Sequence, residues 1–165
     1  MSTQKRNLSD NQIRGYKGTS KWKIGILTAE WNPEVTNALR DAARKTLIQT
    51  GVKETNILSY SVPGSFELIK AAKWMAEKTD VDAVICLGCI IQGETRHFDF
   101  VAAGVTDGIR DLNIRYDIPV IFGVLTTNNQ QQAVDRAGGK YGNKGDEAAA
   151  AALKMIQLNK ELTSG

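Results

Sequence analysis

The run Ala83-Val84-Ile85-Cys86-Leu87-Gly88-Cys89-Ile90-Ile91 constrains the fold more than any other part of this sequence, because it is continuously apolar. A strand with one face in water alternates apolar and polar residues, whereas a strand covered on both faces reads as an unbroken apolar run. The chain then turns at Gly93, and apolar residues recur at helical spacing at Val101, Val105, Ile109 and Leu112. This pattern predicts a buried parallel strand followed by a helix that returns across the sheet.

Strand and helix patterns alternate four times along the chain. Besides the apolar run, we expect strands at residues 23–28, 56–62 and 119–125, and two shorter helices at about 129–137 and 146–158. Such alternation calls for a parallel sheet with right-handed crossovers and helices on both faces. The sequence therefore predicts a three-layer α/β domain with a four-stranded parallel sheet, of the flavodoxin-like kind.

Two of the expected helices have recognisable boundary residues in the sequence. Asn32 stands where a capping residue is expected, Pro33 follows at the first helical position, and Gly51 provides the stop. Thr95 is the expected cap of the helix after the apolar run. The free backbone amides of that helix start could hold an anion beside His97, which is the only histidine in the chain.

Length and composition favour one soluble domain. The 165 residues allow a single core, and 21 basic against 18 acidic residues are mixed along the chain, which argues against a nucleic-acid partner. We expect a polar N-terminal tail at 1–21, one domain at 22–160 and a short tail at 161–165. The absence of an apolar signal segment or membrane span predicts a cytoplasmic protein without membrane contact.

Cys86 and Cys89 have the C-x-x-C spacing of a redox pair or half of a zinc site. Residues three apart on a strand point to opposite faces, and no second cysteine or histidine pair exists to complete a metal shell. We interpret both thiols as small buried residues.

In an open parallel sheet, ligands bind outside the carboxyl ends of the strands. Four groups of residues stand there: Trp31-Asn32, Ser65-Phe66-Glu67, Gly93 to His97, and Thr126-Thr127. They offer aromatic faces, a carboxylate, an imidazole and small hydroxyls, a mixture suited to a planar heterocycle with an anionic group. Each also has a structural interpretation, since aromatic residues can cover a sheet edge and a carboxylate favours a helix start.

Several motifs occur in an order that resembles the lumazine synthase family of riboflavin biosynthesis. They are Trp31-Asn32, Val62-Pro63-Gly64-Ser65-Phe66-Glu67, Gly93-Glu94-Thr95-Arg96-His97-Phe98-Asp99, Pro119-Val120-Ile121-Phe122-Gly123, Asp135-Arg136-Ala137-Gly138 and Gly142-Asn143-Lys144-Gly145. The resemblance covers roughly residues 23–158. It implies a transferase without cofactor or metal, which condenses 5-amino-6-(D-ribitylamino)uracil with 3,4-dihydroxy-2-butanone 4-phosphate to 6,7-dimethyl-8-ribityllumazine.

The resemblance also implies roles for individual residues. The aminouracil and its ribityl chain would contact Trp31, Asn32, Ser65, Phe66, Glu67, Cys89, Ile90, Ile91 and Phe122. The butanone phosphate would contact Glu94, Thr95, Arg136 and Lys144, and His97 would carry protons. Proximity of the two substrates would supply much of the rate.

This chain departs from the family pattern at three positions. Trp31 replaces a residue that is often phenylalanine, and its larger face suggests affinity for riboflavin. Gln92 stands where relatives often have a basic residue, and Cys89 where they often have threonine. The resemblance further implies a homopentamer with Phe122 donated across the subunit interface, a short loop typical of icosahedral shells, and possible association with riboflavin synthase. The N-terminal tail could add to a neighbour's sheet.

Two other classes share parts of this pattern. A flavodoxin-like module that binds a flavin or nucleotide would need the sheet and the aromatic platform, but not His97 beside an anion site. A structural shell protein with a vestigial site would need the interfaces but not the polar residues.

Overall fold

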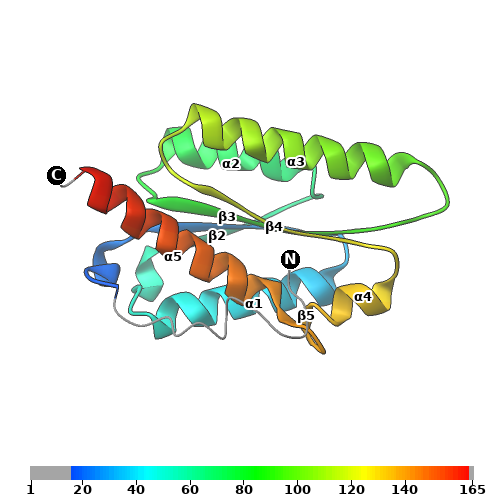
Figure 1. The fold of residues 1–165 in the computed structure, drawn as a ribbon, viewed down its shortest axis with the longest axis horizontal. Coiled ribbons are helices and arrows are strands. Elements are labelled where there is room, and N and C mark those ends of the chain that lie inside the picture. The colour runs from blue at the N-terminus through cyan, green and yellow to red at the C-terminus, as the bar shows by residue number, and fades with distance from the viewer. Residues whose placement is uncertain (1–15, 164–165) are drawn as a thin grey trace.

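The computed structural model describes residues 16–163, and its centre is a parallel four-stranded sheet in the order β2-β1-β3-β4 (Figure 1). The strands are β1 (Ile24–Ala29), β2 (Ile57–Val62), β3 (Ala83–Ile91) and β4 (Val120–Thr127). The predicted strands and their parallel arrangement are confirmed. β3 lies between β1 and β4, so the most apolar strand is also an inner strand.

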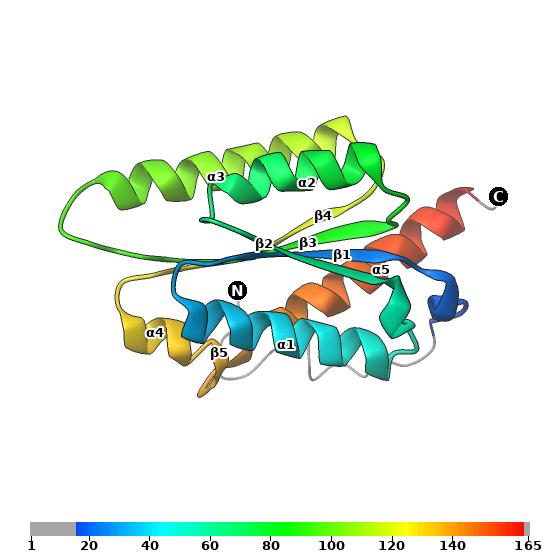
Figure 2. The ribbon, with the colours of Figure 1, turned by 180° about the vertical axis from the view of Figure 1, so that it is seen from behind.

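Helices cover both faces of the sheet. The helices α1 (Pro33–Gln49), α4 (Gln130–Val134) and α5 (Lys144–Thr163) lie on one face, and α2 (Glu67–Lys78) and α3 (His97–Arg115) lie on the other, as the two opposite views show (Figures 1 and 2). Short 3₁₀ turns at Thr19–Lys21 and Glu54–Asn56 precede β1 and β2. The result is the predicted three-layer sandwich.

Burial on β3 alternates between the two layers. Ile85, Leu87 and Cys89 belong to the core cluster beneath α1 and α5, whereas Val84 and Cys86 belong to the cluster beneath α2 and α3. Each of these side chains is at most 3% exposed. The continuous apolar run is therefore explained by two separate cores that meet at one strand.

Two helix starts differ from the expected capping. Asn32 does precede Pro33, but its backbone is left-handed (φ 58°, ψ 56°) and its side chain makes no capping bond. The helix α3 begins at His97 after Arg96 rather than directly after Thr95. The Thr95 hydroxyl still accepts a hydrogen bond from the His97 backbone amide (3.4 Å). In both cases the end signal marks the right place, but the expected capping bond is not the one that forms.

The last third of the chain differs most from its prediction. The helix expected at 146–158 is α5, which spans Lys144–Thr163 and is the longest helix of the described residues, so the expectation of a short helix was wrong. The helix expected at 129–137 shortens to α4. Between them, β5 (Ala137–Gly139) and β6 (Gly142–Asn143) form a small antiparallel hairpin.

The hairpin and the start of α5 are fixed onto α1. The Asn143 side chain donates to the Ala38 carbonyl (3.2 Å) and accepts from the Gly145 amide (2.8 Å). A Cβ at Gly145 would lie 1.9 Å from the Leu39 carbonyl oxygen, so α5 approaches α1 more closely than any side chain allows.

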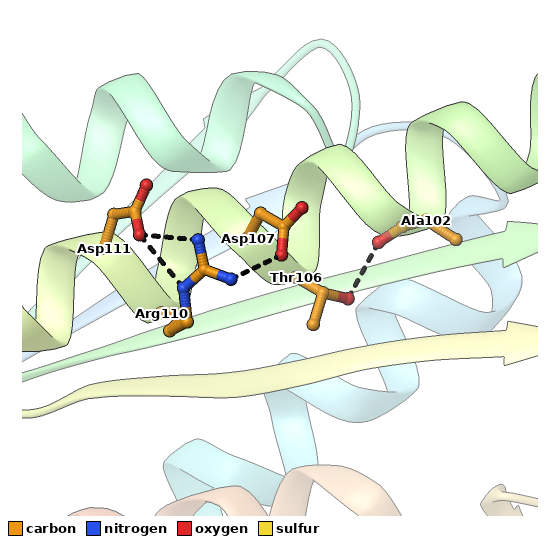
Figure 3. A network of polar contacts seen from close by, with 5 residues as sticks. All are labelled: Ala102, Thr106, Asp107, Arg110 and Asp111. Atoms are coloured by element: carbon orange, nitrogen blue, oxygen red, sulfur yellow. Dashed lines mark hydrogen bonds and ion pairs between the residues drawn. The ribbon is translucent and has the colours of Figure 1, made fainter.

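The middle of α3 carries a network of exposed polar side chains. Arg110 donates to Asp107 and to Asp111, and Thr106 donates back to the Ala102 carbonyl (Figure 3). The Asp111 carboxylate, followed by Asp107, raises the pKa of the Arg110 guanidinium. Because these groups are exposed, the network contributes little to stability. Within residues 16–163, no helix combines the length and hydropathy needed to cross a lipid bilayer.

Replacing Gly145 by Ala should lower the free energy of unfolding by at least the roughly 1–3 kcal/mol typical of overpacking, because the new methyl meets backbone that cannot rotate away. Gly93→Ala is the control, since a Cβ there meets nothing within 4 Å. Urea unfolding of both variants measures the difference. Equal stability of the two would contradict the close approach of α5 to α1.

Candidate active site

A cavity of about 810 Å³ opens at the carboxyl edge of the sheet. Its walls come from the loop after β1, the start of α2, the end of β3 and the first turns of α3. The lining residues are Trp31, Asn32, Gly64, Ser65, Phe66, Glu67, Cys89, Ile90, Ile91, Gly93, Thr95, His97, Phe98, Phe100 and Val101. Ten of the residues predicted from sequence to form a site are therefore neighbours around one space.

The end of β3 presents unpaired backbone to this cavity. β3 pairs with β1 only as far as Leu87, although the strand continues to Ile91. On the β1 side, the Cys89 carbonyl accepts a hydrogen bond from the Asn32 side chain (3.0 Å). Asparagine tolerates the left-handed backbone at this position because its side chain is short and polar. This bond joins the loop after β1 to the end of β3.

Two aromatic rings project from the loops. Trp31 is 72% exposed and Phe66 is 55% exposed, whereas the neighbouring Ser65 is only 6% exposed. Large apolar rings left this open at a concave site are suited to stacking against a planar ligand. Glu67 is the first residue of α2 and is exposed, so its carboxylate is available to a polar ligand.

The opposite wall is the start of α3. His97 and Thr95 are both exposed and line the cavity, and Arg96 pairs with Asp99 (3.6 Å) across the first helical turn. The His97 amide donates to the Thr95 hydroxyl and the Asp99 amide to the Arg96 carbonyl, and the positive end of this 19-residue helix favours an anion there. The imidazole therefore stands at the positive end of a long helix.

Four predicted site residues do not line the cavity: Glu94, Phe122, Arg136 and Lys144. Glu94 is an exposed residue of the neighbouring loop, and Phe122 lies on β4 with 38% exposure. Arg136 donates to the Gln132 carbonyl (2.9 Å) and stacks over Tyr141 at 4.9 Å. Lys144 pairs with the buried Glu147 (2.7 Å).

Sequence reasoning missed the contribution of α3 beyond its first residue. Phe98, Phe100 and Val101 also line the cavity. His97, Phe100 and Val101 have the i, i+3, i+4 spacing of one helix face, which would have placed them together. Thr126 and Thr127, which also follow a strand end, do not line the cavity.

The two cysteines lie on opposite faces of β3, as predicted, and both are free and buried. Burial raises the pKa of the Cys86 thiol from 9.0 to about 12 and that of Cys89 to about 11. Such thiols are poor nucleophiles near neutral pH. Among the described residues, no group of three His, Cys, Asp or Glu side chains is placed to hold a metal ion.

Comparison with known proteins gives a family match over most of the chain. A family profile described as 6,7-dimethyl-8-ribityllumazine synthase matches residues 21–160. The chain belongs to this family. The match contains every residue of the cavity, including the loop that follows β3 and the start of α3.

Individual relatives give the same picture. A 6,7-dimethyl-8-ribityllumazine synthase from Parabacteroides distasonis is 52% identical over 159 residues, covering 96% of this chain and 99% of the relative. The protein of the same name from Cytophaga hutchinsonii is 53% identical, covering 90% of this chain and 96% of the relative. The one from Bacteroides fragilis is 58% identical, covering 82% of this chain and 95% of the relative. Family membership thus extends over almost the whole chain.

The buried thiols predict a specific loss of stability at high pH. The unfolded chain releases the Cys86 proton above about pH 9, whereas the folded protein retains it until about pH 12, so the free energy of unfolding should fall across this interval. The free energy of unfolding of Cys86→Ala should fall less steeply with pH, because one of the two buried thiols is gone. Urea unfolding at several pH values between 8 and 11 measures both slopes, and identical slopes would show that Cys86 titrates alike in both states.

Proposed function

We infer that this protein is a transferase of riboflavin biosynthesis that condenses 5-amino-6-(D-ribitylamino)uracil with 3,4-dihydroxy-2-butanone 4-phosphate. The products are 6,7-dimethyl-8-ribityllumazine, phosphate and water. The observation that carries this inference is the cavity at the carboxyl edge of the sheet, which is lined by aromatic rings, a carboxylate and a histidine. The chain that forms this cavity matches the family over residues 21–160.

The aminouracil would lie between the loop after β1 and the start of α2. Trp31 would stack on the pyrimidine, with Phe66 beside it, and Glu67 would accept hydrogen bonds from the ribityl hydroxyls. Backbone groups of Cys89, Ile90 and Ile91, on the side of β3 that extends past β1, would bond the polar edge of the ring. Support for this orientation comes from the end of β3, which continues beyond its pairing with β1 and lines the same cavity.

The phosphate of the second substrate would lie at the start of α3. The positive end of the helix and the Thr95 hydroxyl, which can donate its own proton, would face this anion, and Glu94 would lie along the same substrate. His97 is then beside both substrates, where an imidazole can move protons near neutral pH.

The chemistry needs few protein groups. The substrate amine attacks the ketone to form a Schiff base with loss of one water, phosphate leaves by elimination, and the second nitrogen closes the ring on the remaining carbonyl with loss of a second water. No cofactor takes part in these steps. Two substrates held side by side react as if at very high concentration, so positioning would carry most of the rate and His97 would assist.

Phe122, Arg136 and Lys144 would act from a neighbouring subunit. All three lie away from the cavity of their own chain, on β4, after α4 and at the start of α5. We propose a cyclic homopentamer in which each interface completes one site, with Arg136 clamping the phosphate. The short connection between α4 and α5 favours further assembly into an icosahedral shell, and association with riboflavin synthase in the cytoplasm is consistent with this role.

Purified protein given both substrates tests the inference directly. Lumazine absorbance and fluorescence should develop faster than in the uncatalysed mixture. A purely flavin-binding module or a structural shell protein would leave the uncatalysed rate unchanged.

Replacing His97 by Asn should reduce turnover by no more than the roughly 10²–10⁴-fold typical of a proton-transfer residue, because the substrates remain juxtaposed. Single-turnover kinetics isolates the chemical step from product release. An unchanged rate of that step would remove His97 from the mechanism.

Arg136→Ala should weaken capture of the butanone phosphate by about 2 kcal/mol through loss of a charge-assisted bond, and should leave aminouracil binding nearly unchanged. Titration with each substrate separately measures the two effects. A loss confined to the aminouracil would assign Arg136 to the other subsite.

Co-expression of the His97→Asn and Arg136→Ala chains tests whether each site is shared. In a cyclic ring of mixed chains, about a quarter of the sites would combine a native His97 with a native Arg136 from the next subunit. Activity of the mixed rings should therefore exceed that of either variant alone. If both residues served the same site from one chain, no site would be native and the mixture would show only the average of the two.

A further inference from the structure

The helices α2 and α3 approach each other closely through two glycines of α3. A Cβ at Gly104 would lie 2.9 Å from Cε2 of Phe66, and a Cβ at Gly108 would lie 2.5 Å from Cδ1 of Ile69. The two glycines are four residues apart and therefore face α2 on the same side of α3. Neither has a positive φ, so the backbone alone would accept alanine at both positions. What excludes a side chain is the residue on α2.

The two contacts differ in what lies behind them. Phe66 lines the cavity and is 55% exposed, whereas Ile69 is partly buried against the core between α2, α3 and the sheet and does not line the cavity. The same chemical change at Gly104 and Gly108 would therefore press on a site residue in one case and on a core residue in the other.

The backbone of Phe66 leaves it little freedom to move away from α3. Phe66 precedes α2 with helical angles (φ −68°, ψ −35°), and its carbonyl accepts the Ile69 amide (3.4 Å). The preceding Ser65 carbonyl accepts the Leu68 amide (3.3 Å). A group added at Gly104 would consequently be accommodated by rotation of the Phe66 side chain, and the open side of that ring is the cavity.

We propose that Gly104 is a specificity-determining position, which holds the Phe66 ring back against α3 and so sets the room for the planar heterocycle. This proposal rests on the function inferred above. Gly104 is a positioning residue, since it acts through Phe66. Gly104 lies on the same face of α3 as His97, Phe100 and Val101. This face lines the cavity over its first turns and then contacts the Phe66 ring at the start of α2.

Gly104→Ala and its matched control Gly108→Ala test the proposal. Gly104→Ala should raise the KM for the aminouracil about tenfold, as expected for one misplaced methyl-sized group in a pocket, and leave the KM for the butanone phosphate within about twofold. Gly108→Ala should change neither KM and should lower only the melting temperature. Equal aminouracil KM values in the two variants would overturn the proposal.

The pair Phe66→Leu and Phe66→Leu/Gly104→Ala tests the same coupling without the clash. If Gly104 acts through the Phe66 ring, adding Gly104→Ala to Phe66→Leu should cause no further change in aminouracil KM. A further tenfold rise would show that Gly104 acts by another route. This pair also decides the matter if Gly104→Ala alone does not fold.

Direct binding separates this proposal from the proposed function. The affinity of each variant for 6,7-dimethyl-8-ribityllumazine can be measured from the fluorescence of the compound, without turnover. Wild-type protein that binds the compound tenfold more tightly than Gly104→Ala supports the role of Gly104 even if catalysis is absent. Equal affinities with normal catalysis would leave the function intact and refute the role of Gly104.

Discussion

Burial of β3 on both of its faces is the constraint on which the rest of the structure depends. Its side chains alternate between two cores, and each fully buried Leu, Ile or Val contributes about 1.5–3 kcal/mol relative to exposure. A strand of this kind is stable only when helices cover both faces, which requires parallel crossovers. Parallel crossovers in turn bring the loops after β1, β2 and β3 to one edge, where the cavity lies.

The site follows from small departures from regularity at that edge. β3 continues beyond its pairing with β1, and the Asn32 side chain donates to the Cys89 carbonyl instead of capping α1. The left-handed turn at Asn32 carries the chain past Trp31, whose ring remains open to solvent. The residues that match the family, 21–160, include every residue that lines the cavity at this edge.

The four strands, their parallel arrangement and the first three helices could be predicted because hydrophobic periodicity is a local property of the sequence. Clustering of Trp31, Phe66 and His97 could also be predicted, since topology alone brings strand ends together. The hairpin at Ala137–Gly139 and Gly142–Asn143 could not, because its short, glycine-rich strands have no side-chain pattern. The start of α5 was missed because Lys144-Gly145 stands in a glycine-rich stretch that resembles a loop, whereas in the structure Gly145 packs against the backbone of α1. Phe122, Arg136 and Lys144 do not line the cavity of their own chain, and the role proposed for them requires a neighbouring subunit.

The helix α3 connects the cavity with the beginning of β4. Its 19 residues span about 28 Å, with His97 at the cavity and Asn113 near the other end. The Asn113 side chain donates to the Val120 carbonyl (2.7 Å) and accepts the Val120 amide (2.9 Å), which attaches the far end to the beginning of β4. A small tilt at this distant attachment would be transmitted along a rigid rod to the imidazole. The position of the imidazole thereby depends also on residues that do not line the cavity.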